Sequence, residues 1–435
     1  MYNISDKTNK NNKKRGILMA KILSQYSVFD YMEIEHLGDL ERLQLCFDAI
    51  DDTDLVLALK KDRGHGRDDY PVEVMLNCFY AMKVFGHKSI EDFRRECSRN
   101  VQLRWLCGLY APCKRKHLVP PSRVFSKFTE KLITHQDKLN TIFQSLVDDL
   151  YVSVDRFGQT VAGDGKIIQS YANVQTDKID TDRRSETEAR WAKKVYHYTD
   201  ASGKERQKST SYFGYRAHIL CDVKTELPIQ LTVTPANTNE KNQMKKMLEQ
   251  LSAHQKDKLN YLLLDRGYDS LDLYRAIIDM NALPIIDKRD MWQDNNETRQ
   301  YKDTDMVYDV KGNVYYVDEN IKKIPMTYKG YDKERDALRY EHNGKIYRIK
   351  RKEDERIFTP LARQSKKFKR LYKGRTAVER LNGRLDRDYQ FEDHTIRGLG
   401  KMTMLVTFSA IIMLAMAKGH IAKKQKNYAS LYRFA

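Results

Sequence analysis

Two aspartates stand where short buried strands are expected to end. Asp164 closes the segment TVAGD, and Asp265 closes the segment YLLLD. Ligands of open α/β sheets collect at the carboxyl ends of the strands, so these side chains are candidates for one shared site. A single aspartate at a strand end is also a common turn former. Two carboxylates brought together repel each other unless a divalent cation neutralises them, and all-oxygen ligation favours Mg²⁺, with Mn²⁺ as a substitute.

A third acid, Glu379, lies within YKGRTAVERLNGRLDR (372–387), where five of sixteen residues are basic. The stretch is expected to be helical, and the spacing places Tyr372, Arg375 and Glu379 on one helical face. One interpretation is a solvated i,i+4 ion pair between Arg375 and Glu379. The other interpretation is that Glu379 is a third metal ligand, beside arginines that bind phosphate. Three carboxylates can hold two metal ions about 3.5–4 Å apart, an arrangement that hydrolyses phosphodiesters.

The charge of the chain indicates an anionic partner. Its 435 residues include 78 Lys and Arg against 60 Asp and Glu, a formal net charge of +18. Such a surplus is typical of proteins that bind nucleic acid or an anionic membrane surface. Residues 341–387 hold 16 Lys and Arg against 6 Asp and Glu, so more than half of the net charge lies around Glu379. The apolar run 402–417 is short for a spanning helix, so we expect a buried core helix and no membrane association.

Other site chemistries find no support in the residue spacing. The six cysteines show no C-x-x-C pair and the eleven histidines show no H-E-x-x-H, which argues against a zinc site or a disulfide framework. Asp269 precedes an apolar helical pattern and is expected to be a helix N-cap, with Ser270 as the other capping candidate. Asp222 is expected to start a hairpin turn, and His218 to be structural within a strand.

The elements that must position these residues change in character along the chain. Residues 1–19 are polar and basic and are expected to be disordered, whereas 20–150 read as helices of a DNA-binding domain. From 151 to 288 the expected order is β-β-β-α-β-α-β, a mixed sheet with helices on both faces, in which a polar, charged stretch runs to about residue 210. Alternating runs and the Asn343–Gly344 turn predict a β-rich insertion at 289–365. Helices follow at 366–418, and 419–435 is expected to be a basic tail.

Several segments, taken together, resemble the successive blocks of bacterial insertion-sequence transposases of the DDE type. The resemblance covers about residues 30–418, and "VPPSRVFSKF" resembles the helical domain that precedes the core in this group. The blocks are VAGDGK (161–166), YFGYRAHILCDVKTELPIQLTVTPANTNE (212–240), LLLDRGYDS (262–270) and RTAVERLNGRL (375–385). The resemblance implies an α/β, RNase H-like catalytic core with an insertion before its third acid.

The resemblance also implies site residues. Asp164, Asp265 and Glu379 would be the catalytic, metal-binding acids. One branch of the family carries a Tyr-Arg-Glu-Lys signature, whose first three places match Tyr372, Arg375 and Glu379, while the fourth falls on Asp386. Arg384 or Arg387 could supply that missing cation. An aromatic residue of the insertion stacks on a displaced base in this branch. Trp292 is the candidate here, with a core tryptophan as the alternative. The residues expected to contact the DNA backbone are Arg380, Arg384, Arg387, Lys366, Lys367, Lys369, Arg370 and Lys373.

The function implied is cut-and-paste transposition. Two Mg²⁺ ions would activate water to nick the ends of the element, and the freed 3′-OH would attack target DNA. The partners would be double-stranded DNA, as inverted-repeat ends and as target, and further copies of the chain in a dimer or higher oligomer. The location would be the bacterial cytoplasm, at the nucleoid. The alternatives are a metal-dependent nuclease without strand transfer, a catalytically silent DNA-binding derivative, and a structural RNA-binding protein.

Overall fold

The computed structural model describes residues 37–65, 69–109, 118–173, 186–200, 203–289, 292 and 296–423. The tail expected at 1–19 lies outside this range, as do residues 424–435 of the tail expected at 419–435. Cys113 lies outside it as well. The other five cysteines are buried and free.

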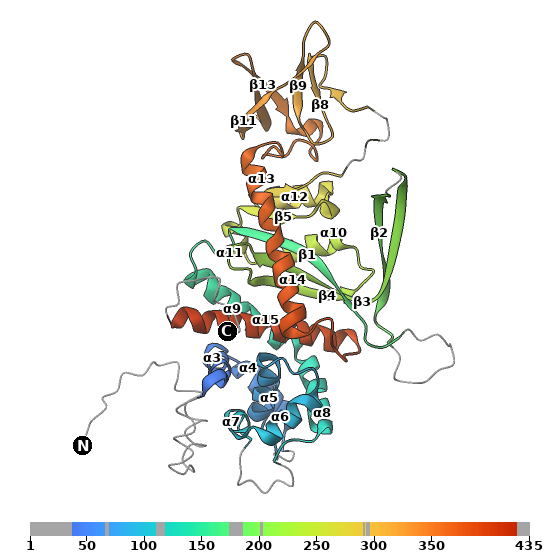
Figure 1. Ribbon diagram of the computed structural model, residues 1–435. Coiled ribbons are helices and arrows are strands. Elements are labelled where there is room, and N and C mark those ends of the chain that lie inside the picture. The colour runs from blue at the N-terminus through green and yellow to red at the C-terminus, as the bar shows by residue number, and fades with distance from the viewer. Residues whose placement is uncertain are drawn as a thin grey trace, which may run out of the picture.

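The first part of the chain is helical and packs beneath the sheet (Figure 1). Pro71 precedes α5, and Gly86, with φ of +60°, follows its end, as the sequence predicts. The Ser89 hydroxyl caps α6 by accepting a hydrogen bond from the Asp92 amide. The helices are η1 (Gly38–Leu40), α3 (Glu41–Ala49), α4 (Thr53–Arg63), α5 (Val72–Val84), α6 (Ile90–Arg99), α7 (Val101–Leu106), α8 (Ser122–Thr134) and α9 (Gln136–Ser153).

The central sheet has the RNase H-like topology that the resemblance implies. Its strands are β1 (Thr160–Gln169), β2 (Arg190–Thr199), β3 (Glu205–Asp222), β4 (Pro228–Pro235), β5 (Tyr261–Leu264) and β6 (Leu283–Ile286). The order is β4-β3-β1-β5-β6, with β2 also paired to β3. β1, β3 and β4 are antiparallel neighbours, whereas β5 and β6 run parallel to β1.

Helices cover both faces of this sheet. A Cβ at Gly163 would meet Met244 of α10 (Glu240–Glu249), whereas the next side chain, Asp164, contacts Asn382 of α14 (Thr376–Tyr389). Successive side chains of a strand point to opposite faces, so α10 and α14 lie on opposite sides. The other helices of this part are α11 (Ala253–Lys258), η2 (Arg266–Tyr268), α12 (Leu271–Asp279), α13 (Lys366–Tyr372) and η4 (Lys373–Arg375).

A two-stranded arm occupies part of the stretch that the sequence predicted only to be polar and charged. β2 pairs with the first half of β3, and the arm stands at the side of the sheet (Figure 1). Trp191, Lys193, Lys194, Val195 and Tyr198 are all exposed. Because most of the described side chains of β2 are exposed, its sequence lacks the apolar alternation by which a strand is recognised.

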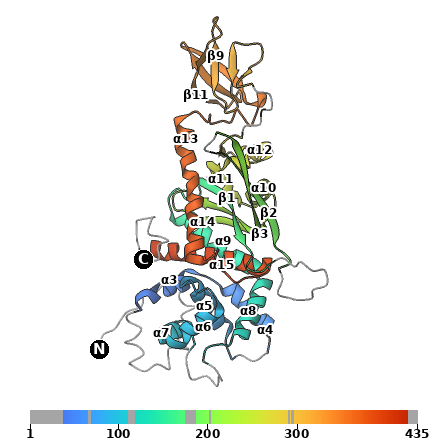
Figure 2. The ribbon, with the colours of Figure 1, turned by 45° about the vertical axis from the view of Figure 1, so that its right-hand side comes forward.

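The β-rich insertion forms two small sheets around a core of its own, at the end of the molecule opposite the N-terminal helices (Figures 1 and 2). The first contains β7 (Arg299–Gln300), β8 (Met306–Tyr308), β9 (Val314–Val317) and β10 (Lys323–Pro325). The second contains β11 (Thr327–Asp332), β12 (Ala337–His342) and β13 (Lys345–Lys350), followed by η3 (Arg351–Glu353). Asn343 and Gly344 both have positive φ, as the predicted hairpin turn between β12 and β13 requires.

The apolar run near the end of the chain forms α15 (Leu399–Ala422), which lies between the sheet and the N-terminal helices (Figure 2). It is long and apolar enough to cross a membrane, but 78% of its most apolar window is buried inside the protein. Phe408 packs against Phe79 and Tyr80 of α5. The helix continues four residues past the expected start of the basic tail, because Gly419 packs closely on Leu45 of α3.

Candidate active site

The two aspartates lie side by side at the sheet edge that the sequence predicted. Gly163 of β1 is in register with Leu264 of β5, so the next residues, Asp164 and Asp265, are neighbours on parallel strands. Neighbouring strands lie about 4.8 Å apart. One expectation was wrong: β1 does not end at Asp164 but continues to Gln169, because its second half keeps its pairing with β3. β5 does end directly before Asp265.

The electrostatics of Asp164 reflect this neighbour. Burial and the charge of Asp265 raise the pKa of Asp164 above its ordinary value, while the Gly165 amide and the cations of Lys194 and Arg375 act in the opposite direction. Asp265 accepts a hydrogen bond of 2.7 Å from the Gly267 amide, which fixes its carboxylate at the start of η2. The pair therefore has the mutual repulsion expected of carboxylates that share a cation.

A third aspartate extends the row. Leu264 is in register with Ile286 of β6, so Asp287 follows its strand as Asp265 follows β5. Burial raises the pKa of Tyr372 and Arg375 lowers it, while the charges of Asp287 and Asp265 raise it, so both carboxylates act electrostatically on this phenol. Sequence reasoning missed Asp287, although the segment LPIID carries the same signal of an apolar run that ends in an acid.

Glu379 lies on α14 and makes the surface ion pair that the sequence offered as one of two interpretations. Its carboxylate is 2.7 Å from the Arg375 guanidinium, and its side chain is 49% exposed. Among the residues that the structure describes, no three His, Cys, Asp or Glu side chains are placed to hold a metal ion. The expected set of three acids is therefore represented here by two neighbouring aspartates and a glutamate that faces Arg375.

The start of α14 is nevertheless pressed against the end of the sheet beside the aspartates. A Cβ at Gly374 would lie 2.9 Å from a Val223 methyl and 3.1 Å from a Leu263 methyl, so a residue without a side chain permits the approach. One turn after Glu379, the Asn382 amide lies 3.5 Å from Asp164. The sequence gave no signal for Asn382, whose contact partner is 218 residues away.

Arg375 connects the two parts of the site. Its guanidinium pairs with Glu379 and lies over the Tyr372 ring at 5.9 Å. Burial lowers its pKa, but the hydrogen bond to Glu379 and the charges of Tyr372 and Asp265 outweigh burial and raise it. A cation is thus held between the aspartates and Glu379, at the face where the signature predicted a phosphate contact.

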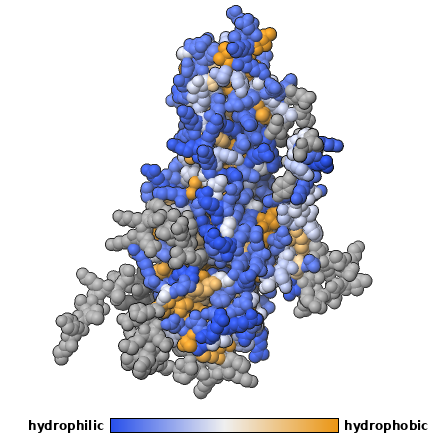
Figure 3. All heavy atoms as spheres, viewed as in Figure 1, coloured by the Kyte–Doolittle hydropathy of each residue, from blue (hydrophilic) through white to orange (hydrophobic). Residues whose placement is uncertain are grey.

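The basic residues expected to contact DNA divide into an exposed group and a buried one. Arg380 and Arg384 both bind Glu226, and Arg384 is 8% exposed, so it does not belong to an open DNA surface. Arg387 is exposed and pairs with Asp388. The hydrophilic surface of Figure 3 extends over the side on which α13 and α14 lie in Figure 1. The exposed cations of α13 and η4 are Lys366, Lys367, Lys369, Arg370 and Lys373.

Trp292 packs within the insertion. Its ring lies edge-on to Tyr308 at 6.2 Å, and the Arg299 guanidinium covers it at 4.4 Å. Trp292 is partly buried against the core of the insertion, and its stacking on a displaced base stays a prediction.

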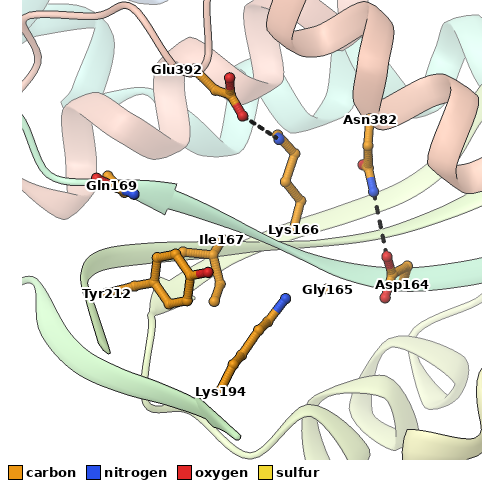
Figure 4. A pocket seen from close by; sticks show the side chains of 9 residues that line it. All are labelled: Asp164, Gly165, Lys166, Ile167, Gln169, Lys194, Tyr212, Asn382 and Glu392. Atoms are coloured by element: carbon orange, nitrogen blue, oxygen red, sulfur yellow. Dashed lines mark hydrogen bonds and ion pairs between the residues drawn. The ribbon is translucent and has the colours of Figure 1, made fainter. Parts of the chain in front are cut away.

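The position where the signature expects a lysine is occupied by an ion pair. The side chain of Asp386 is 24% exposed, and its carboxylate is 2.7 Å from the ammonium of Lys166, on β1. Lys166 also lines a pocket of about 540 Å³ beside the aspartate row (Figure 4). Its other lining residues are Asp164, Gly165, Ile167, Gln169, Lys194, Tyr212, Asn382 and Glu392.

Two further aspartates have structural roles. Asp222 is buried and accepts hydrogen bonds from the Gly158, Lys224 and Thr225 amides, which anchors the hairpin turn that it was expected to start. The N-cap position of α12 is held by Ser270, so the expectation for Asp269 was wrong.

Asp269 is instead buried and binds the Arg356 guanidinium, which joins the insertion to the core. Burial raises the pKa of Asp269, but the hydrogen bonds from Arg356 and the Arg289 amide, together with the charges of Lys288 and Arg356, outweigh burial and hold this pKa below its ordinary value.

Comparisons with known proteins identify the family of the chain. A family model described as a transposase domain matches residues 33–131. No curated protein matches the chain. One similar solved structure is the cryo-EM structure of a piggyBac transposase synaptic complex with hairpin DNA, at 10% identity and a TM-score of 0.38, with 92% of this chain and 80% of that chain covered. A second family model, the transposase DDE domain, matches residues 163–415, more than half of the sequence, and the chain therefore belongs to the DDE transposases.

Proposed function

We propose that this transposase cuts DNA at the ends of an insertion sequence by metal-dependent hydrolysis and joins the freed 3′ end to target DNA. The observation that carries the proposal is the pair Asp164 and Asp265, on adjacent parallel strands of the domain that gives the family its name. Asp164, Asp265 and Glu379 are the proposed catalytic and metal-binding residues.

The donor set at the sheet edge fits a hard divalent cation. Carboxylate and amide oxygens are the ligands that Mg²⁺ and Mn²⁺ prefer. Asp164 and Asp265 are neighbours, and within the described part of the chain the buried Oδ1 atom of Asn382 has no hydrogen-bond partner, which leaves a further oxygen unsatisfied beside them. When bound, two divalent cations would lower the pKa of a water and stabilise the leaving oxygen of the phosphodiester.

Glu379 would complete the set by exchanging its partner. Its side chain is half exposed, so the pair with Arg375 costs little to open. A DNA phosphate is a bidentate ligand for the same guanidinium. We infer that phosphate binding to Arg375 releases Glu379, which then turns toward the aspartates. Binding of the DNA substrate would thereby bring Glu379 to the two aspartates and complete the active site.

The remaining residues hold the substrate. Tyr372 positions Arg375 through the contact between the ring and the guanidinium. The exposed cations of α13 and η4 would follow the backbone of duplex DNA without reading its sequence. The proposed DNA partners are the ends of the element and the target DNA. A dimer or higher oligomer of the chain would hold both, in the bacterial cytoplasm.

A plasmid that carries the gene with its flanking DNA tests the proposal. Purified protein and Mg²⁺ should produce mapped breaks at the element ends, and a second plasmid should receive the joined product. Breaks without joined product would indicate the nuclease alternative. Cleavage that persists in both Asp164→Asn and Asp265→Asn would refute the proposed site.

One observation favours a second candidate, a DNA-binding derivative without catalysis. The ion pair between Arg375 and Glu379 separates the third acid from the two aspartates in the structure as it stands. Specific binding of the element ends without any Mg²⁺-dependent cleavage would establish that function instead.

A further inference from the structure

We propose that Lys166, held in place by Asp386, binds a DNA backbone phosphate in the pocket beside Asp164. The inference rests on the proposed function, because it assumes that the cleaved DNA strand passes this pocket. It also accounts for the acid at residue 386, because the cation that the signature would place on α14 is supplied from β1.

The pair between Lys166 and Asp386 brings together two elements that are far apart in the sequence. Lys166 follows Asp164 by two residues on the same strand, so both side chains point to the face that α14 covers. The ammonium and the carboxylate are 2.7 Å apart, and their side chains are 11% and 24% exposed. The signature expects the cation on α14, whereas this chain carries the cation, Lys166, on β1 and the acid, Asp386, on α14. A cation therefore still lies next to the proposed catalytic acids.

The ammonium keeps donors for a ligand. A lysine has three N–H groups, and Asp386 takes one of them within the described part of the chain. The Glu392 carboxylate is 3.8 Å from the Lys166 ammonium, an ion pair beyond hydrogen-bond distance (Figure 4). Glu392 is 75% exposed, so solvent screens its attraction. Two N–H groups are therefore available to oxygens that enter the pocket.

The pocket itself suits one segment of a nucleic-acid backbone. Its volume of about 540 Å³ lies within the usual range of ligand sites, about 300–1,000 Å³. Lys194 of β2 brings a second ammonium to its wall. β5 pairs with β1 only as far as Gly163, so this strand does not cover that edge of β1 beyond Asp164. A phosphate bound by Lys166 would lie two residues along β1 from Asp164, which would bring the neighbouring phosphodiester toward that carboxylate.

The alternative is a purely structural ion pair that ties β1 to α14. The two roles differ in what each substitution does. Lys166→Gln removes the charge that would meet DNA, whereas Asp386→Asn weakens the tie and leaves the ammonium in place. Lys166→Gln combined with Asp386→Lys removes the pair but returns a cation to α14, where the signature places it.

The test is the salt dependence of DNA binding. The probe is a fluorescent duplex copied from the DNA that flanks the gene, measured by anisotropy in Ca²⁺ at a series of salt concentrations. The slope of log affinity against log salt is negative, and one lost phosphate contact reduces its magnitude by about 0.9. This corresponds to about eightfold weaker binding at ~0.1 M salt. We expect this loss for Lys166→Gln, the wild-type slope for Asp386→Asn, and a restored slope for the double variant.

A wild-type slope in Lys166→Gln would overturn the inference. If Lys166→Gln does not fold, the double variant provides the test. A slope of smaller magnitude in the double variant than in the wild type would also overturn the inference. Failure of the proposed function gives a different result. In that case wild-type protein never cleaves in Mg²⁺, whatever the slopes are.

Discussion

The position of Arg375 depends on a glycine, and this dependence can be measured. Gly374→Ala would place a Cβ 2.9 Å from Val223 and 3.1 Å from Leu263. Carbon atoms in contact normally lie about 3.5–4.0 Å apart, so η4, which leads into α14, and these side-chain methyls must move apart by about 0.5–1 Å. Overpacking of this kind costs about 1–3 kcal/mol. Alanine returns at most about 1 kcal/mol of helix propensity, and full return leaves an expected net loss of about 0–2 kcal/mol.

Gly383→Ala is the matched control. Gly383 belongs to α14, is exposed, and has nothing within 4 Å of an added Cβ. The same substitution should therefore raise the free energy of unfolding by about 0.5–1 kcal/mol. The free energy of unfolding should therefore fall in Gly374→Ala and rise in Gly383→Ala, although the chemical change is identical.

Thermal unfolding measures the change in stability, and single-turnover cleavage measures the change in catalytic rate. A misplacement of about 1 Å can cost about 10²-fold in rate, so Gly374→Ala should cleave about tenfold to a hundredfold more slowly than wild type. Gly383→Ala should keep the wild-type rate. A Gly374→Ala protein as stable and as active as Gly383→Ala would refute the close packing of α14 on the sheet.

Two further predictions concern the contact between the insertion and the core. Arg356→Met should lower the free energy of unfolding by about 3–5 kcal/mol, because it leaves the buried Asp269 carboxylate without its partner. Arg275→Met, at the exposed pair with Glu355, should cost at most about 1 kcal/mol, and equal losses in urea titrations would contradict this account. Although burial raises the pKa of Asp269, its hydrogen bonds and the charges of Lys288 and Arg356 together lower it overall. The contribution of Asp269 to stability is therefore complete above the ordinary pKa of about 3.9 and is lost as the pH falls through the lowered value. Asp269→Asn should flatten that acid limb of the stability profile, and an unchanged limb would speak against the assignment.

The sequence predicted the features that depend on local pattern. Apolar runs ending in an acid located Asp164 and Asp265, because parallel neighbours end at the same edge of a sheet. The Asn343–Gly344 turn was predicted because only a few residues adopt positive φ easily. The helical spacing predicted the shared face of Arg375 and Glu379, and the structure adds that the two are paired.

The features that were missed depend on partners far along the chain. Arg384 was assigned to the DNA surface because its neighbours are basic, but Glu226, 158 residues away, holds it in the interior. Lys166 meets Asp386 across 220 residues. Charge complementarity between such distant residues leaves no periodicity in a single sequence. The strand β2 was missed for a different reason, since a strand whose described side chains are mostly exposed needs no apolar alternation.

The most direct test of the central claim compares two aspartate variants in one cleavage assay. Asp265→Asn removes a carboxylate of the aspartate row, and Asp272→Asn removes an exposed carboxylate on α12, seven residues later. With the plasmid that carries the element, Mg²⁺-dependent breaks at the element ends should be absent from Asp265→Asn and unchanged in Asp272→Asn. Wild-type cleavage by Asp265→Asn would show that the sheet-edge carboxylates do not form the active site.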